Sequence, residues 1–250
     1  MVGFANHTTP KNPYPEFTLN SYKVNLFSMI TPTMRRYAAE IYRLQEDRSY
    51  VSLSDLSEHV NASTQAISRM IGRLRDGGFV MHEPYRGVRL TGLGEKIAMP
   101  AIRRHRVVEV FMVRVLGFGW DEVHDHADRF ELGVDDTIED RIFEAAGRPA
   151  RCPHGEPIPG KEGVMPELQD ASLVEMKRGE SYRLSRVRIH DPEKLRYLGE
   201  LGFYPGTCFD YLSQGPFDGP LRIRKGRDEI VLSYDLAARL FVEPDCDKRE

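Results

Sequence analysis

The order of local structures predicted between residues 54 and 91 constrains the fold more than any other feature of the sequence. Cap residues, glycines and apolar periodicity predict a short helix, a turn, a longer helix and a two-stranded hairpin. An earlier apolar stripe of Tyr37, Ile41 and Leu44 predicts a first helix from Thr33, capped by Thr31 or Thr33. This order is typical of a winged helix-turn-helix. The predicted segments are 54–60, 61–62, 63–78, 79–83 and 88–91.

The longer helix has one apolar face and one polar, basic face. Its apolar face carries Ile67, Met70, Ile71 and Leu74, and Ser63 is placed to cap it. Short polar and basic groups on the opposite face are of the kinds that reach base edges and phosphates in a major groove. Ser63 serves equally well as a simple cap or as a phosphate ligand. The candidate DNA-binding residues are Ser63, Thr64, Gln65, Ser68, Arg69 and Arg73 on this helix and Arg86 in the hairpin.

Charge is distributed unevenly along the chain, although the net charge is only −3. Residues 31–116 hold 14 Lys and Arg against 9 Asp and Glu, whereas residues 117–150 hold 3 against 10. A basic first part and an acidic second part fit a nucleic-acid-binding unit joined to a cation-binding unit, though solvated helix faces alone give the same tally.

The cysteines and the apolar pattern indicate the compartment. Cys152, Cys208 and Cys246 are odd in number and widely spaced, which argues against a disulfide framework or a structural zinc knuckle. No apolar run approaches the roughly 20 residues needed to span a bilayer, and no secretion signal is visible. We therefore expect a cytoplasmic protein without membrane association. Residues 1–30 contain three prolines and are expected to form a flexible arm.

Residues with metal-ligating side chains follow the predicted winged helix. His105 and Glu109 are four apart, and His124, Asp128 and Glu131 follow with spacings of four and three, so each set shares one face of a helix. Two such faces packed together have the donors to hold a divalent cation of the manganese, iron or zinc kind.

These residues lie in segments that resemble the diphtheria-toxin-repressor-like family of iron- and manganese-dependent regulators. The similar segments are Thr31-Pro-Thr-Met34, Tyr85-Arg-Gly-Val-Arg-Leu-Thr91, Arg104-His-Arg-Val-Val-Glu109, His124-Asp-His-Ala-Asp-Arg-Phe-Glu131 and Cys152-Pro-His-Gly-Glu-Pro-Ile-Pro159. The segment 198–206 is similar to the SH3-like domain that also occurs with ferrous-iron transporters.

The resemblance implies a mainly α fold: a winged helix-turn-helix head, a helical dimerisation and metal-binding domain, and a small C-terminal all-β SH3-like barrel. Strand candidates at 182–189, 207–212, 221–224 and 229–232 and a short helix at 195–201 support the barrel independently. The expected boundaries are 1–30 for the arm, 31–96 for the head, 97–165 for the helical domain and 172–245 for the barrel.

The resemblance also implies roles for single residues. His105, Glu109 and His124 match one family metal site, Cys152 and His154 match loop ligands used with the Glu109 position in other members, and His190 or Asp191 lies where the barrel supplies a ligand. Asp128 and Glu131 belong to a second site that departs from the pattern. Arg36, Ala39 and Leu132 stand there where relatives place ligands. We expect Arg36 to fill this second site with its charge, as a pseudo-site.

The implied function is metal-dependent transcriptional regulation. A homodimer activated by Mn²⁺ or Fe²⁺, with Zn²⁺ or Co²⁺ as substitutes in vitro, is expected to bind a palindromic DNA operator and to repress metal-uptake genes. A metal-independent winged-helix regulator is the alternative. A metallohydrolase would need an open coordination position and a substrate cleft, and the sequence has no nucleophile motif or phosphate loop, so no enzyme is expected.

Overall fold

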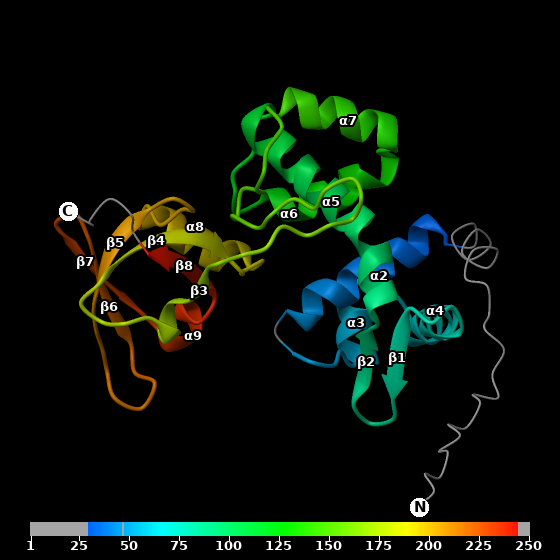
Figure 1. The fold of residues 1–250 in the computed structure, drawn as a ribbon, viewed down its shortest axis with the longest axis horizontal. Helices are drawn as coiled ribbons and strands as arrows, with labels where there is room; N and C mark the ends of the chain where they lie inside the picture. Colours follow the sequence, from blue (N-terminus) through cyan, green and yellow to red (C-terminus); the bar gives the residue numbers. More distant parts are fainter. Residues whose placement is uncertain (1–29, 47, 245–250) are drawn as a thin grey trace, which may run out of the picture.

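The computed structural model describes residues 30–46 and 48–244. Almost all of the arm expected at residues 1–30 therefore lies outside the described residues. The described chain forms a helical part with a small two-stranded sheet and a separate C-terminal β domain (Figure 1).

The first unit is a winged helix-turn-helix. Thr31, Ser52 and Ser63 each cap one of its three helices by accepting a hydrogen bond from a backbone N–H three residues on. The third helix buries the four apolar residues predicted from the sequence and is followed by its C-cap residue, Gly77. The elements are α2 Pro32–Gln45, α3 Leu53–His59, α4 Thr64–Asp76, β1 Val80–Glu83 and β2 Gly87–Leu90.

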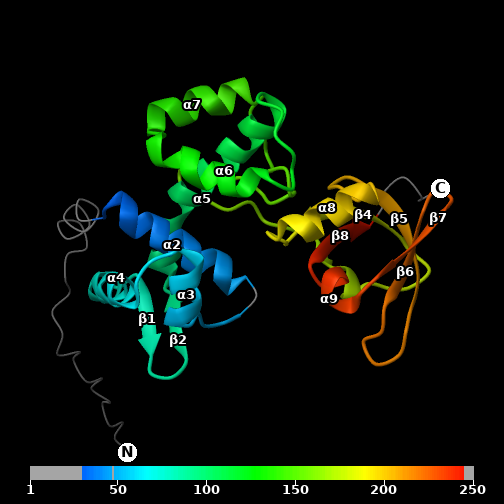
Figure 2. The same cartoon turned by 180° about the vertical axis from the view of Figure 1, so that it is seen from behind.

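A long helix, α5 (Gly92–Arg114), connects the first unit to the second. Thr91 caps α5 and also donates from its backbone N–H to the carbonyl of Phe79 in the wing, so the helix starts from the hairpin itself. Further along, α5 packs against α6 (Val123–Phe130) and α7 (Asp136–Ala145), with the 3₁₀ turn Glu131–Gly133 between those two helices. The same helix therefore spans the wing and the helical domain (Figure 2).

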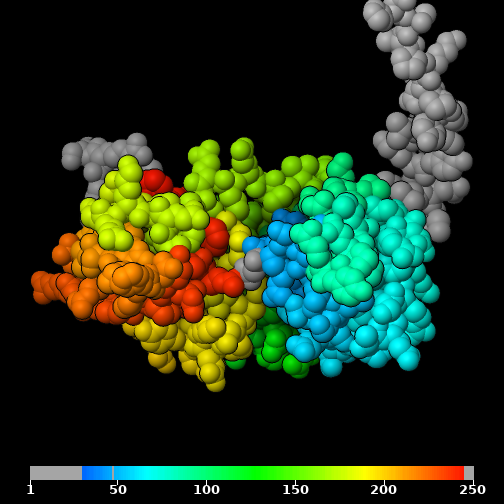
Figure 3. Space-filling view, turned by 90° about the horizontal axis from the view of Figure 1, so that it is seen from below, coloured from blue at the N-terminus to red at the C-terminus, as the bar shows by residue number. Residues whose placement is uncertain are grey.

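The C-terminal unit is a six-stranded antiparallel sheet with the strand order β3-β8-β4-β5-β6-β7. Its apolar residues form a core separate from that of the head. Seen from below, this unit and the head meet along a seam (Figure 3). Its elements are β3 Ala171–Ser172, η2 Leu173–Glu175, β4 Ser181–Val187, α8 Pro192–Glu200, β5 Cys208–Gln214, β6 Leu221–Lys225, β7 Asp228–Leu232, α9 Tyr234–Ala237 and β8 Leu240–Pro244.

The predicted fold class is confirmed. The four predicted strands of the C-terminal domain are present as β4 to β7, and the short helix begins at Pro192, three residues earlier than predicted. The predictions omitted β3 and β8, which pair with each other, and β8 also pairs with β4. Within the described residues, no helix is both long enough and apolar enough to cross a membrane.

Gly87 provides a test of how the wing is attached to the head. Its φ is +113°, and an added Cβ would lie 2.2 Å from the carbonyl oxygen of Val51, which pairs with Val88 by two backbone hydrogen bonds of 2.8 Å. We expect Gly87→Ala to destabilise the head by about 1–3 kcal/mol, measured by thermal or denaturant unfolding. Gly92→Ala, at a helical position with open space, is the matched control. Equal stability of the two variants would contradict this account.

Candidate metal centre and nucleic-acid interface

A buried carboxylate, Glu109 on α5, lies at the centre of a cluster of metal-ligating side chains. Its Oε1 is 3.2 Å from Nε2 of His105, 3.1 Å from Nδ1 of His124 on α6 and 3.6 Å from Nδ1 of His154. Only 3% of the Glu109 side chain is exposed. Since the three imidazoles come from two helices and one loop, a single carboxylate oxygen joins three separate segments of the chain.

Hydrogen bonds outside the cluster orient two of these imidazoles. Nε2 of His154 donates to the backbone carbonyl of Trp120 at 2.8 Å, so Nδ1 is the ring nitrogen that faces Glu109. Nδ1 of His105 faces Glu131 at 3.0 Å and Asp128 at 3.2 Å, so Nε2 faces Glu109. Such outer partners fix ring orientation and tautomer at metal sites.

The loop that carries Cys152 and His154 is closed on itself. Cys152 donates its backbone N–H to the carbonyl of Glu156, and Gly155 donates to the carbonyl of Cys152. The thiol of Cys152 is buried and forms no disulfide within the described residues, and its Sγ lies 4.0 Å from Nδ1 of His154. The loop therefore adds a sulfur and a nitrogen donor beside Glu109.

Electrostatics keep the cluster charged in the absence of a metal ion. Burial raises the pKa of Glu109, but the neighbouring His105 and His154 outweigh burial and hold its pKa well below the usual range. Burial and the nearby Arg43 lower the pKa of His105, yet Glu109 and Asp128 raise it well above the usual range. A divalent cation entering this cluster must therefore displace protons from imidazole.

The donor chemistry of the cluster fits a divalent transition metal. Two donor groups each have ligand atoms that lie within 4.8 Å of one another, namely His105, His124 and Asp128, and Glu109, Cys152 and His154. Imidazole and thiolate favour zinc, iron or cobalt ions over magnesium or calcium, and the carboxylates of Glu109 and Asp128 also suit manganese.

The remaining candidate ligands lie at different distances from the centre. The cluster lines a small cavity, and His190, which follows β4, lines the same cavity. The ring centroid of His190 is 4.7 Å from that of His124. Asp191 instead caps α8, accepting from the backbone N–H groups of Glu193 and Lys194. The structure therefore brings His190, but not Asp191, to the cluster. His126 packs on Phe118, away from the cavity.

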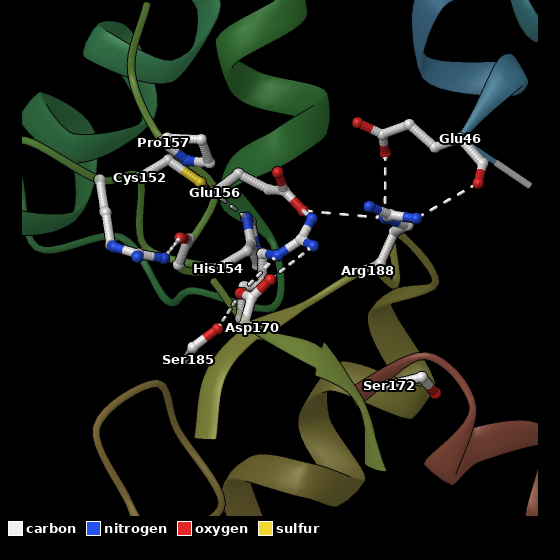
Figure 4. Close-up of polar contacts among 12 residues, drawn as sticks. Glu46, Cys152, His154, Glu156, Pro157, Asp170, Ser172, Ser185 and Arg188 are labelled. Carbon is white, nitrogen blue, oxygen red and sulfur yellow. Dashed lines mark hydrogen bonds and ion pairs between the residues drawn. The ribbon is translucent and has the colours of Figure 1, made fainter. Parts of the chain in front are cut away.

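Charged side chains from all three units meet next to the cluster (Figure 4). Glu156, two residues beyond His154, pairs with Arg186 on β4 at 3.1 Å. Arg188, also from the C-terminal unit, donates to the backbone carbonyl of Glu46 at the end of α2 at 3.2 Å, and its Nε lies 3.9 Å from Glu156. The loop that carries His154 is thus linked electrostatically to the head and to the C-terminal domain.

The arginine beside the acidic residues of α6 differs from the predicted one. Arg36 lines a surface hollow whose other residues include Arg104 and Glu131, and the described chain shows no ion pair between Arg36 and Asp128. Asp128 instead lies 3.9 Å from Arg43, which is two turns further along α2. The sequence analysis missed Arg43, although its position seven residues after Arg36 places both on the same helical face.

The predicted DNA-binding residues of α4 lie together on the surface. Ser63 caps the helix by accepting from the backbone N–H of Ala66, and Arg73 is exposed in the last turn. In the wing, Arg86 is exposed, stacks over Tyr50 at 4.2 Å and pairs with Glu83. A shallow surface hollow on α4 is lined by Thr64, Gln65, Ser68 and Arg69.

A winged helix-turn-helix joined by one continuous helix to a buried cluster of imidazole, thiol and carboxylate donors defines a class of protein, the metal-responsive DNA-binding regulators. Comparison with known families places the chain within this class. Residues 29–88 match the N-terminal DNA-binding domain of iron-dependent repressors, residues 91–160 match their metal-binding and dimerisation domain, and residues 171–244 match the FeoA domain.

Individual relatives agree with these matches. The chain is 31% identical over 226 residues to the iron-dependent repressor IdeR of Mycobacterium tuberculosis, covering 86% of this chain and 98% of that protein. It is 27% identical to the diphtheria toxin repressor of Corynebacterium efficiens, and the match covers 86% of this chain and 96% of that protein. The chain therefore belongs to the family of the diphtheria toxin repressor and IdeR. It is a metal-dependent DNA-binding transcriptional repressor of the iron and manganese type and not an enzyme.

Solved structures show the same relationship. A manganese-dependent transcriptional repressor in complex with manganese is similar with a TM-score of 0.76 and 31% identity, covering 85% of this chain and all of that one. ScaR with bound Cd²⁺ is similar with a TM-score of 0.72 and 28% identity, covering 86% of this chain and all of that one. Divalent-metal binding, a DNA operator and a dimerisation domain follow for this chain from its family.

The central position of Glu109 generates a test of the metal centre. We expect Glu109→Gln to weaken Mn²⁺ or Zn²⁺ binding by about 100-fold or more, beyond the 10–100-fold typical of outer-sphere partners, because the amide removes the charge that three imidazoles face. Titration calorimetry or elemental analysis after dialysis measures the effect. Glu144→Gln on α7, which removes an exposed ion pair with Arg148, is the control. Unchanged affinity in Glu109→Gln would contradict the assignment.

Proposed function

We propose that a homodimer of this chain binds a palindromic operator when it is loaded with Mn²⁺ or Fe²⁺, and that it thereby represses genes for metal uptake. The observation that carries the proposal is the convergence of five donors at the junction of the three units. These donors are His105, Glu109, His124, Cys152 and His154. The family places metal binding and dimerisation in the same domain.

The geometry supports a linkage mechanism. A bound divalent cation would supply the positive charge that compensates Glu109 and would release the imidazole protons. His124 on α6 and the loop with Cys152 and His154 would then be held against α5. Since α5 begins at the wing, a fixed arrangement around Glu109 restricts how the head sits on the helical domain. Metal binding therefore favours one spacing of the two heads in a dimer.

That spacing determines the operator. In a two-fold dimer, the two α4 helices enter successive major grooves about 34 Å apart, which requires a palindromic site. Gln65 and Arg69 are the proposed base readers, Arg73 and Ser63 the proposed phosphate contacts of the helix, and Arg86 the phosphate contact of the wing.

The proposed metal ions follow from donor chemistry and from relatives. Cys152 as a ligand favours Zn²⁺ or Co²⁺ in vitro, because thiolate binds these ions tightly. The relatives include repressors named as iron-dependent and a repressor solved with manganese, which favours Fe²⁺ or Mn²⁺ as the physiological ion. A cytoplasmic location is consistent with a DNA partner and with Cys152 and Cys208, neither of which forms a disulfide within the described residues.

Operator binding in the presence and absence of metal tests the proposal. We expect Mn²⁺ to raise operator affinity by about 5- to 150-fold and a chelator to abolish the increase, as measured by fluorescence anisotropy at fixed salt. Glu109→Gln is expected to bind DNA like the chelated wild type.

Arg69→Ala serves as the control for the head. It should lose about 1–3 kcal/mol of operator affinity both with and without Mn²⁺ and keep its metal binding. Equal operator affinity of the wild type with Mn²⁺ and with chelator would support a metal-independent regulator instead.

A further inference from the structure

Arg43 is a buried cation at the edge of the metal cluster. Its side chain is only 9% exposed, and it lines the same cavity as His105, Glu109 and His124. Burial by itself lowers the pKa of Arg43, but four surrounding carboxylates raise it above its usual range. In order of influence they are Glu40, Glu131, Asp128 and Glu109. The guanidinium therefore supplies a permanent positive charge inside this acidic part of the domain.

The position of Arg43 is fixed from two sides. On its own helix, Nη1 donates to Oε1 of Glu40 at 2.8 Å, and Nε2 of His59 on α3 lies 3.1 Å from the other oxygen of Glu40. Burial raises the pKa of Glu40, but the contacts with Arg43 and His59 lower it to about 2. Two elements of the head thus hold the guanidinium towards α6.

On the opposite side, Arg43 faces one of the two donor groups. The group formed by His105, His124 and Asp128 includes the carboxylate that lies 3.9 Å from Arg43. Asp128 also lies 3.2 Å from Nδ1 of His105. The carboxylate of Asp128 therefore already faces Arg43 and His105. In contrast, the ion pairs of Glu109 within the described residues are all with histidines and none is with an arginine.

We propose that the guanidinium of Arg43 takes the place of a second metal ion at Asp128, so that each chain loads one divalent cation, at the group centred on Glu109. This inference rests on the proposed metal-responsive function. Arg43 acts here as a specificity-determining residue, because a guanidinium cannot lose its proton to make room for an incoming cation. Asp128 and Glu131 then orient His105 through Nδ1 and do not bind the ion themselves.

The arrangement also connects the cluster to the head without a metal ion. Asp128, Arg43, Glu40 and His59 form a chain of charged contacts from α6 through α2 to α3, the first helix of the helix-turn-helix. A guanidinium in this place keeps α6 attached to the head in every metal state. Only the ion at Glu109 then remains to respond to metal availability.

The test is the number of Mn²⁺ ions bound per full-length chain, measured by equilibrium dialysis and elemental analysis. We expect one ion for the wild type and one more for Arg43→Met, because the neutral side chain leaves Asp128 and Glu131 free to bind a cation. Arg43→Lys keeps the charge and should bind one ion. Arg36→Met, on the same face of α2, is the matched control and should also bind one ion.

The same count for Arg43→Met and the wild type would overturn the proposal. If Arg43→Met fails to fold by circular dichroism, Asp128→Asn decides the question. Its count should equal that of the wild type, and loss of an ion would show that Asp128 is a metal ligand. The proposed function is judged separately, by the ion that disappears in Glu109→Gln. If the wild-type protein binds no Mn²⁺ ion, the proposed function is contradicted. The difference in the number of bound Mn²⁺ ions between Arg43→Met and the wild type would still test the role of Arg43.

Discussion

The structure depends on one buried carboxylate. Removing the charge of Glu109 from water is costly unless opposite charges compensate it, and here three imidazoles surround a single oxygen. Those imidazoles come from α5, α6 and the loop at residues 152–158, so charge compensation itself holds these segments together. An exchange of imidazole protons for a metal ion would change the strength of that compensation at a point where these three segments already meet. This is what a sensor requires, because the ligand must bind one arrangement better than another.

Charges also join the three units to each other. Glu46 at the end of α2, Glu156 in the metal-binding loop and Arg188 on the C-terminal domain meet at their common junction. The head and the C-terminal domain have separate apolar cores, and this junction between them is largely ionic. The side chains of Glu46, Glu156 and Arg188 are only 12–19% exposed. Removing one partner of a buried ion pair leaves an uncompensated charge, so each of the three side chains contributes to holding the units at this junction.

The sequence predicted the elements of the head and most strands of the C-terminal domain because their signals are local. Ser63 caps α4 and the apolar face of α4 is buried as expected, since both depend only on spacing along one helix. The short strand β3 has two residues and no periodicity to detect, and β8 pairs with strands far away in the sequence. The grouping of His105 and Glu109 also followed from helical spacing, whereas their contact with the loop of Cys152 and His154 could be inferred only from resemblance to a family.

The second acidic position shows where sequence reasoning ends. Arg36 and Arg43 are seven residues apart, so they lie about 20° apart around the helix and roughly two turns apart along it. Helical periodicity gives both the same face and cannot say which one reaches Asp128. The crossing of α2 over α5 decides this, and it brings Arg43 to the cluster while Arg36 lies at a surface hollow. Arg43 also contacts Glu40, which in turn contacts His59 on α3. Because Arg43 and not Arg36 reaches Asp128, the donor cluster is connected to the helix-turn-helix through a continuous series of charged contacts.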